Sequence, residues 1–222
     1  MDVDIKLIFK PPETAVRAAA LVLLLAASLL ALEVRDWNDR PLGYGTAVVY
    51  DEGGGVVALS YVLDGKALYG LPWRPGYGLR IAWGIATLSE VATGRLIWIY
   101  DSSVARDVAE LGWPTGGKIR TWTYPITITL RDRQGKPVAG CYAKVVDTLT
   151  GGRWVAVFAS TASDGSVSAY QIPATDYKVE VYCNGVLSAT AKFSVQRGAP
   201  STAWNYQITV DFIDQIKVSN AP

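Results

Sequence analysis

Residues 126–130 read ITITL, and residues 132–140 follow as DRQGKPVAG. The apolar side chains of Ile126, Ile128 and Leu130 alternate with threonines, which is the period of a β-strand with one buried face. The glycine and proline of the second stretch are residues that favour a tight turn. We therefore predict a strand over 126–130 that ends in a turn at 132–140.

Two further elements follow this turn. Residues 163–165, SDG, form a second turn signal, and residues 177–183, YKVEVYC, alternate as a second strand. The D-x-x-G-x-P-V-x-G turn, the later D-G turn and the Y-x-V-x-V strand resemble the transthyretin-like, carboxypeptidase-regulatory type of immunoglobulin-like domain. The resemblance covers residues 124–196 and implies an immunoglobulin-like β-sandwich. Such domains are usually non-catalytic modules of extracellular and surface proteins, so it implies no catalytic residue.

Cys141 and Cys183 are the only cysteines in the chain. On the period of two, Cys141 shares a face with Ala143, and Cys183 shares one with Val181, so both sulfurs should point into the same sandwich. Outside the cytoplasm we expect a disulfide, and two buried thiols are the alternative. A disulfide closing a loop of about 43 residues would add ~4 kcal/mol in the chain-entropy model.

A further alternating stretch follows the predicted sandwich, within residues 203–219. Its apolar face comprises Tyr206, Ile208, Val210 and Phe212. An unpaired strand of this kind would expose backbone donors and apolar side chains. We therefore predict that residues 206–213 pair in a sheet outside their own sandwich. The partner is either the first domain, which we favour, or a neighbouring subunit by strand exchange.

Residues 42–120 are expected to form a first β domain with one short helix, after a linker at residues 37–45. Two long strands are predicted at 79–91 and 95–100, and the helix at 102–112. A loop at residues 71–78, LPWRPGYG, is rich in proline and aromatic residues. Trp73, Arg74 and Tyr77 in this loop are the candidate surface for carbohydrate or protein. Packing of the loop against its own domain is the alternative that we favour.

Residues 18–32 read AAALVLLLAASLLAL, without a charge. With its flanks the stretch predicts a helix over residues 13–34, which at about 1.5 Å per residue spans about 33 Å. Three interpretations remain open: an uncleaved membrane anchor, a cleaved secretory signal, and a filament-core helix, because Arg17-Ala18 resembles a prepilin-peptidase site. Residues 1–12 form a tail before the helix.

The composition excludes several function classes. The chain has no histidine and a net charge of +1, which removes the commonest general base and most zinc sites and leaves no basic patch dense enough for nucleic acid. Asp51, Glu52 and Glu90 are the carboxylates considered for a glycosidase pair, but solvated loop charges are the better interpretation. Residues 112–118, GWPTGGK, approximate a phosphate-binding loop but lack the serine or threonine that must follow the lysine. We expect no catalytic residue, metal or cofactor.

The sequence therefore predicts a mainly β protein. An N-terminal hydrophobic helix, transmembrane or in a filament core, precedes two β domains, the second an immunoglobulin-like sandwich. The expected function is that of a non-enzymatic structural or assembly subunit of the cell envelope, a surface filament or a virion. It would contact the membrane or other copies of itself through residues 13–34, with the bulk of the chain outside the cytoplasm. The alternatives are a membrane-anchored adhesin that uses exposed Trp and Tyr, and an accessory subunit of a membrane enzyme complex.

Overall fold

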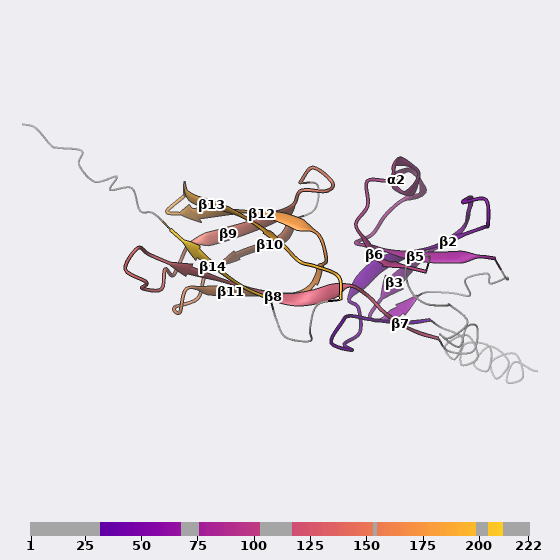
Figure 1. The fold of residues 1–222 in the computed structure, drawn as a ribbon, viewed down its shortest axis with the longest axis horizontal. Helices are drawn as coiled ribbons and strands as arrows, with labels where there is room; N and C mark the ends of the chain where they lie inside the picture. Colours follow the sequence, from indigo (N-terminus) through magenta and orange to yellow (C-terminus); the bar gives the residue numbers. More distant parts are fainter. Residues whose placement is uncertain (1–31, 68–75, 103–116, 153–154, 199–203, 211–222) are drawn as a thin grey trace, which may run out of the picture.

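The computed structural model describes residues 32–67, 76–102, 117–152, 155–198 and 204–210. These residues form two β units, which lie end to end in an elongated molecule (Figure 1). The first, called the N-terminal unit, contains β1 (Glu33–Arg35), β2 (Tyr44–Tyr50), β3 (Val56–Leu63), β4 (Lys66–Ala67), β5 (Gly78–Trp83), α2 (Leu88–Thr93), β6 (Trp98–Asp101) and β7 (Lys118–Arg120). The second, called the sandwich, contains β8 (Thr123–Arg131), β9 (Tyr142–Asp147), β10 (Val155–Ser160), β11 (Ser166–Pro173), β12 (Asp176–Cys183), β13 (Val186–Ser194) and β14 (Trp204–Thr209).

The N-terminal unit is one sheet curled around a core. Its strand order is β6-β5-β2-β3-β4-β1-β7. Inward residues of all seven strands, such as Val34 on β1 and Ile81 on β5, belong to one buried cluster. The two edge strands of this sheet, β6 and β7, come together. The Trp122 amide, just after β7, donates to the Ile99 carbonyl of β6 at 2.7 Å. Outside this sheet α2 covers a second, smaller cluster around Val48 and Ala82.

The sandwich consists of two sheets around one core. A four-stranded sheet has the order β10-β9-β12-β13, and a three-stranded sheet has the order β11-β8-β14. The predicted alternation places Ile126, Ile128 and Leu130 of β8 in this core opposite Val179 and Val181 of β12, all at most 1% exposed. The predicted β-sandwich is therefore confirmed as an architecture, with two sheets that bury one apolar face each.

The predicted disulfide is present between Cys141 and Cys183, whose Cα atoms are 4.4 Å apart. Both residues are buried, at 3% and 6% exposure. Cys141 comes just before β9, and Cys183 ends the neighbouring strand β12. The bond therefore ties two adjacent strands of the four-stranded sheet at one end, across a sequence separation of 42 residues.

Replacing both cysteines by alanine should lower the free energy of unfolding by about 4 kcal/mol, because the unfolded chain regains the freedom that the bond removes. Chemical denaturation of the oxidised protein, the reduced protein and the double variant measures this. Reduction of the variant should change nothing. Equal stability of the oxidised and reduced wild type would contradict the prediction.

The predicted partner of the C-terminal strand is wrong. β14 pairs parallel with β8 of its own sandwich, with Trp204 opposite Ile126 and Thr209 opposite Arg131. Ile208 and Val210 are buried in the sandwich core, and Phe212 lies outside the described residues. Without β14, one edge of β8 would be open, since only β11 pairs with it on the other side. β14 therefore pairs with the free edge of β8, which would otherwise expose unpaired backbone groups, and not with another sheet as predicted.

The N-terminal boundary also differs from the prediction. Residues 13–31 of the predicted helix lie outside the described residues, but Glu33 and Val34, its last two residues, form part of β1. Val34 is fully buried in the N-terminal unit, so its side chain belongs to that core and not to a membrane helix. The N-terminal unit thus begins before residue 42, and residues 37–45 are no free linker, because the Trp37 amide donates to the Thr123 carbonyl.

The predicted strand 79–91 ends at Trp83, and α2 follows. Thr87 caps this helix: its hydroxyl accepts from the Glu90 amide, and the Glu90 carboxylate accepts from the Thr87 amide. Gly94 ends it in the left-handed conformation, with a φ of 69°. The capping box and the terminal glycine are local signals of a helix, and they outweigh the apolar pattern that predicted a strand up to residue 91. The helix predicted at 102–112 lies almost wholly outside the described residues.

Burial of tyrosines predicts loss of stability in alkali. Removal from water raises the pKa of Tyr100 to about 12, that of Tyr206 to about 12, and that of Tyr177 further. An unfolded tyrosine ionises near a pKa of about 10. Stability should hold below that pH and fall as pH rises from about 10 through about 12, because only the unfolded chain then loses these protons. Denaturant titrations over this range, with phenolate absorbance, test it, and Tyr206→Phe should make the fall shallower. A free energy of unfolding that stays constant up to about pH 12 would refute it.

Candidate functional surfaces

The junction between the two units is a short crossing with hydrogen bonds to both units. β7 ends at Arg120 and β8 begins at Thr123. Between them the Trp122 amide donates to Ile99 of the N-terminal unit, and its carbonyl accepts from Ala174 of the sandwich. Thr121 and Thr123, both 0% exposed, share a hydrogen bond of 2.9 Å between their hydroxyls. No free linker separates the units.

The Trp122 ring is held on both sides at this crossing. It stacks on the Tyr100 ring of β6 with centroids 6.2 Å apart. The Arg197 guanidinium lies 4.1 Å from its centroid. One aromatic side chain thus contacts a strand of the first unit and the segment after β13 of the second, which adds packing and cation–π attraction to the backbone bonds.

Gln171 connects the units on another side of the crossing. It sits at a bulge of β11 with a φ of 58°, and its side chain reaches the segment before β2. Its Nε2 donates to the Pro41 carbonyl at 2.6 Å, and its Oε1 accepts from the Gly43 amide at 2.8 Å. The neighbouring Tyr170 ring lies 5.2 Å from the Arg40 guanidinium. A bulge that redirects a side chain is a common way to aim a contact.

Gln171→Ala should loosen the angle between the units. It removes two partly exposed hydrogen bonds, worth about 1 kcal/mol together after solvent competition. Small-angle scattering should show a broader distribution of interatomic distances, and denaturation a small loss of stability. Gln134→Ala, on the exposed turn after β8, is the matched control and should change neither. An unchanged scattering profile for Gln171→Ala would mean that the junction does not depend on this amide.

A shallow cavity of about 290 Å³ lies beside the hairpin that joins β2 to β3. Its lining includes Tyr50, Asp51, Glu52, Arg80 and Asp101. Arg80 pairs with Asp101 at 3.0 Å and lies over the Tyr50 ring, 5.0 Å from its centroid. Asp51 accepts from the Gly55 amide of its own hairpin. Burial raises the pKa of the Tyr50 hydroxyl, which keeps it neutral.

The carboxylates considered for catalysis serve local structure. Asp51 closes a hairpin turn, and Glu90 caps α2 on the exposed outer side of the sheet. They are not brought together in one site, because Glu90 does not line the cavity that Asp51 and Glu52 share. Among the described residues, no group of three or more acidic, histidine or cysteine side chains could hold a metal ion.

The aromatic loop is described only in part. Trp73 and Arg74 lie outside the described residues, whereas Tyr77 is half-buried and packs against the core of the N-terminal unit. The contacts of Tyr77 agree with the alternative that we favoured, in which the loop packs on its own domain. Trp122 and Gln171 were not singled out from the sequence, because both lie in alternating stretches and only the tertiary structure shows which neighbours they reach.

Comparisons with known proteins give no family for the chain. No family model matches, and no curated protein matches. Similar solved structures include the minor pilin GBS52 of Streptococcus agalactiae, with a TM-score of 0.39 and 11% identity over 81% of this chain and 94% of that chain. The shaft pilin SpaA of Lactobacillus rhamnosus GG has a TM-score of 0.31 and 10% identity, covering 82% of this chain and 98% of that chain.

The major pilin subunit BcpA of Bacillus cereus has a TM-score of 0.34 and 13% identity over 80% of this chain and 66% of that chain. These structural neighbours are pilins of Gram-positive bacteria with β-rich domains. Scores and identities this low decide neither the fold family nor the function of this chain. Among the described residues no helix is long and apolar enough to cross a membrane.

Proposed function

We propose that this protein is a non-enzymatic structural subunit of a cell-surface layer or filament. The hydrophobic segment before residue 32 would hold it in a membrane or in a filament core. The observation that carries the proposal concerns Leu32 and Val210, the first and last described residues of an elongated, two-unit molecule. Leu32 precedes a strand that runs toward the junction, and Val210 follows a strand that runs away from it. A stalk or a polymer subunit needs this arrangement, whereas a catalyst does not.

The direction of β1 supports the proposal. β1 runs parallel to β7, and β7 leads through Trp122 directly into the sandwich. β1 therefore points toward the junction, and Leu32, just before it, lies on the side of β1 away from the sandwich.

The direction of β14 also supports the proposal. β14 runs parallel to β8, which leads away from the junction. Val210 therefore lies near the tip of the sandwich, beside Arg131, whose carbonyl accepts from its amide.

The internal construction suits a subunit that bears load. The junction is hydrogen-bonded on both sides of Trp122, and the disulfide locks the end of the four-stranded sheet. Secreted and surface proteins gain stability from disulfides because their environment allows the bond to persist. These features favour a durable extracellular part over a mobile enzyme.

Expression of the full chain with and without residues 1–31 tests the proposal. The full chain should be recovered with membranes or as regular polymers in electron micrographs, and the shortened chain should be a folded, soluble monomer. Deletion of residues 211–222 is the control and should leave the association intact. Dispersed full-length monomers that keep residues 1–31 in aqueous buffer would reject the proposal. A mature chain that begins at Leu29 would reject the anchor and the filament core alike.

A binding role is the second candidate, favoured by exposed aromatic rings around the junction. Tyr44 and Tyr170 are 48% and 63% exposed. Tyrosine suits contact surfaces because it offers a rigid apolar ring and a polar tip. A glycan array probed with the folded protein distinguishes the two roles, since a pure structural subunit should bind no glycan selectively.

A further inference from the structure

One outer face of the N-terminal unit carries a row of directly paired residues. Leu63 on β3 pairs with Lys66 on β4, Lys66 pairs with Glu33 on β1, and Glu33 pairs with Lys118 on β7. Directly opposed residues on neighbouring strands point to the same side of a sheet. The inward neighbours, such as Val34, fill the core, so this row faces outward.

The next pair on the same face joins two cations. Arg35 on β1 lies directly opposite Arg120 on β7. Like charges in opposed positions destabilise a sheet. Arg35 is paired with Glu33 at 3.0 Å, and the Arg120 guanidinium lies 5.8 Å from the centroid of the Trp37 ring. Asp39 is the nearest carboxylate to Arg120, at 4.0 Å, and its closest partner is Lys118, at 2.6 Å. We call Lys66, Lys118, Arg35 and Arg120, with Glu33 and Asp39, the basic face.

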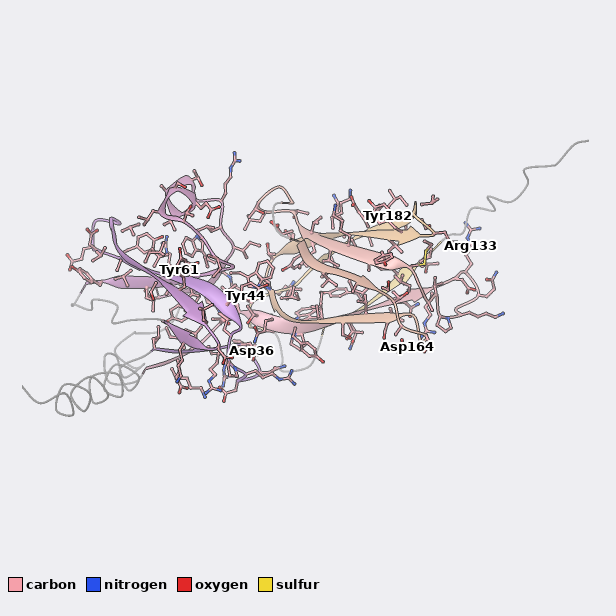
Figure 2. The ribbon with its side chains drawn as sticks, turned by 180° about the vertical axis from the view of Figure 1, so that it is seen from behind. Asp36, Tyr44, Tyr61, Arg133, Asp164 and Tyr182 are labelled. Atoms are coloured by element: carbon pink, nitrogen blue, oxygen red, sulfur yellow. A yellow bond between two sulfur atoms is a disulfide. The ribbon has the colours of Figure 1, made fainter. Side chains whose placement is uncertain are left out.

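The basic face keeps an excess of positive charge. It presents four cations against two carboxylates, whereas the whole chain has a net charge of only +1. The Lys118 and Arg120 side chains are 49% and 55% exposed, and Lys66 is exposed. In Figure 2 nitrogen-ended side chains gather along this side of the N-terminal unit, close to Asp36.

Exposed apolar side chains border the basic face on one side. Leu63 is 46% exposed, and Tyr44, its direct partner on β2, is 48% exposed. Tyr61, two residues before Leu63, is 39% exposed. α2 covers the outer side of the sheet over Val48 and Ala82 and leaves these three side chains in contact with solvent. Cations beside exposed tyrosine and leucine are the composition of a surface at a membrane interface.

The hydrophobic stretch joins the molecule in the middle of this face. Leu32, its last residue, immediately precedes Glu33, which pairs with Lys66 on one side and Lys118 on the other. A segment held in a bilayer up to about residue 31 leaves the basic face only a few residues from the lipid headgroups. At ~3.3 Å per extended residue, the two steps from residue 31 to Glu33 span about 7 Å, which is close to the depth of one headgroup region.

We propose that the basic face rests on an anionic lipid bilayer and fixes the N-terminal unit against the membrane. The proposal rests on the membrane-held form of the proposed function. Lipid phosphates would pair with Arg35, Arg120 and Lys66, and Tyr61 with Leu63 would enter the headgroup region. A second copy of the chain is a poorer occupant, because two identical positive faces repel in a two-fold contact.

The experiment compares the full chain in nanodiscs of neutral lipid, in nanodiscs with an added anionic phospholipid, and in detergent. A water-soluble acylating reagent modifies exposed lysines, and peptide mass spectrometry gives the rate at each. Lys66 and Lys118 should react at least about fivefold more slowly in anionic nanodiscs than in neutral ones. Lys136 and Lys192, both exposed on the sandwich, should react equally in all three. About 1 M salt should restore the rates.

A charge-reversed variant gives a second measurement. Lys66→Glu with Arg120→Glu should abolish the protection of Lys118 in anionic nanodiscs, and Lys136→Glu with Lys192→Glu should preserve it. Circular dichroism checks that both variants fold. Equal rates in neutral and anionic lipid would overturn the proposal, and so would protection in detergent that rises with protein concentration, which would assign the face to a second copy.

Binding of the full chain to the two kinds of bilayer distinguishes failure of the membrane anchor from failure of the basic face. If the full chain binds neither kind of bilayer, the membrane-held form and the basic face both fail. If it binds only anionic bilayers and salt releases it, the hydrophobic anchor fails and the basic face is supported. If it remains in both bilayers but no lysine is protected, the anchor stands and the basic face is refuted.

Discussion

The backbone hydrogen bonds around Trp122 are the constraint on which the rest of the molecule depends. A buried amide or carbonyl without a partner costs about as much as a lost hydrogen bond. At the crossing, Thr121 donates to Arg35, Trp122 donates to Ile99, and Thr123 accepts from Trp37. These partners lie in β1, in the segment just after it and in β6, so the crossing requires the first and the sixth strand of the N-terminal unit to be in place.

The same constraint orders the sandwich. Because Ala174 donates to the Trp122 carbonyl, the end of β11 is fixed at the junction, and the bulge before it aims Gln171 at the N-terminal unit. β8 begins at the crossing and is the central strand of its sheet, so its other edge needs a partner. β14 supplies that partner and buries Ile208 in the core. The direction of β8 then brings Val210 to the end of the sandwich away from the junction.

The positions of Leu32 and Val210 and the composition of the basic face follow from these strand directions. β1 must run toward the junction for Trp37 to reach Thr123, and Leu32 before it lies beside β4, where its carbonyl accepts from the Ala67 amide. Both neighbours of β1, β4 and β7, present lysines to solvent. The three residues of β1 thus contribute Val34 to the core and Glu33 and Arg35 to the outer face.

The sequence by itself determined the elements whose signals are local. The alternation of 126–130 and 177–183 and the shared inward faces of Cys141 and Cys183 required only a period of two. The capping box from Thr87 to Glu90 was an equally local signal that the prediction of a long strand over 79–91 overlooked. The tertiary structure alone decided the partner of β14, the recruitment of residues 33–35 into a sheet and the roles of Trp122 and Gln171. These features depend on which strand edges remain unpaired after the other strands have paired. The sequence of a strand does not show which of those edges it will pair with.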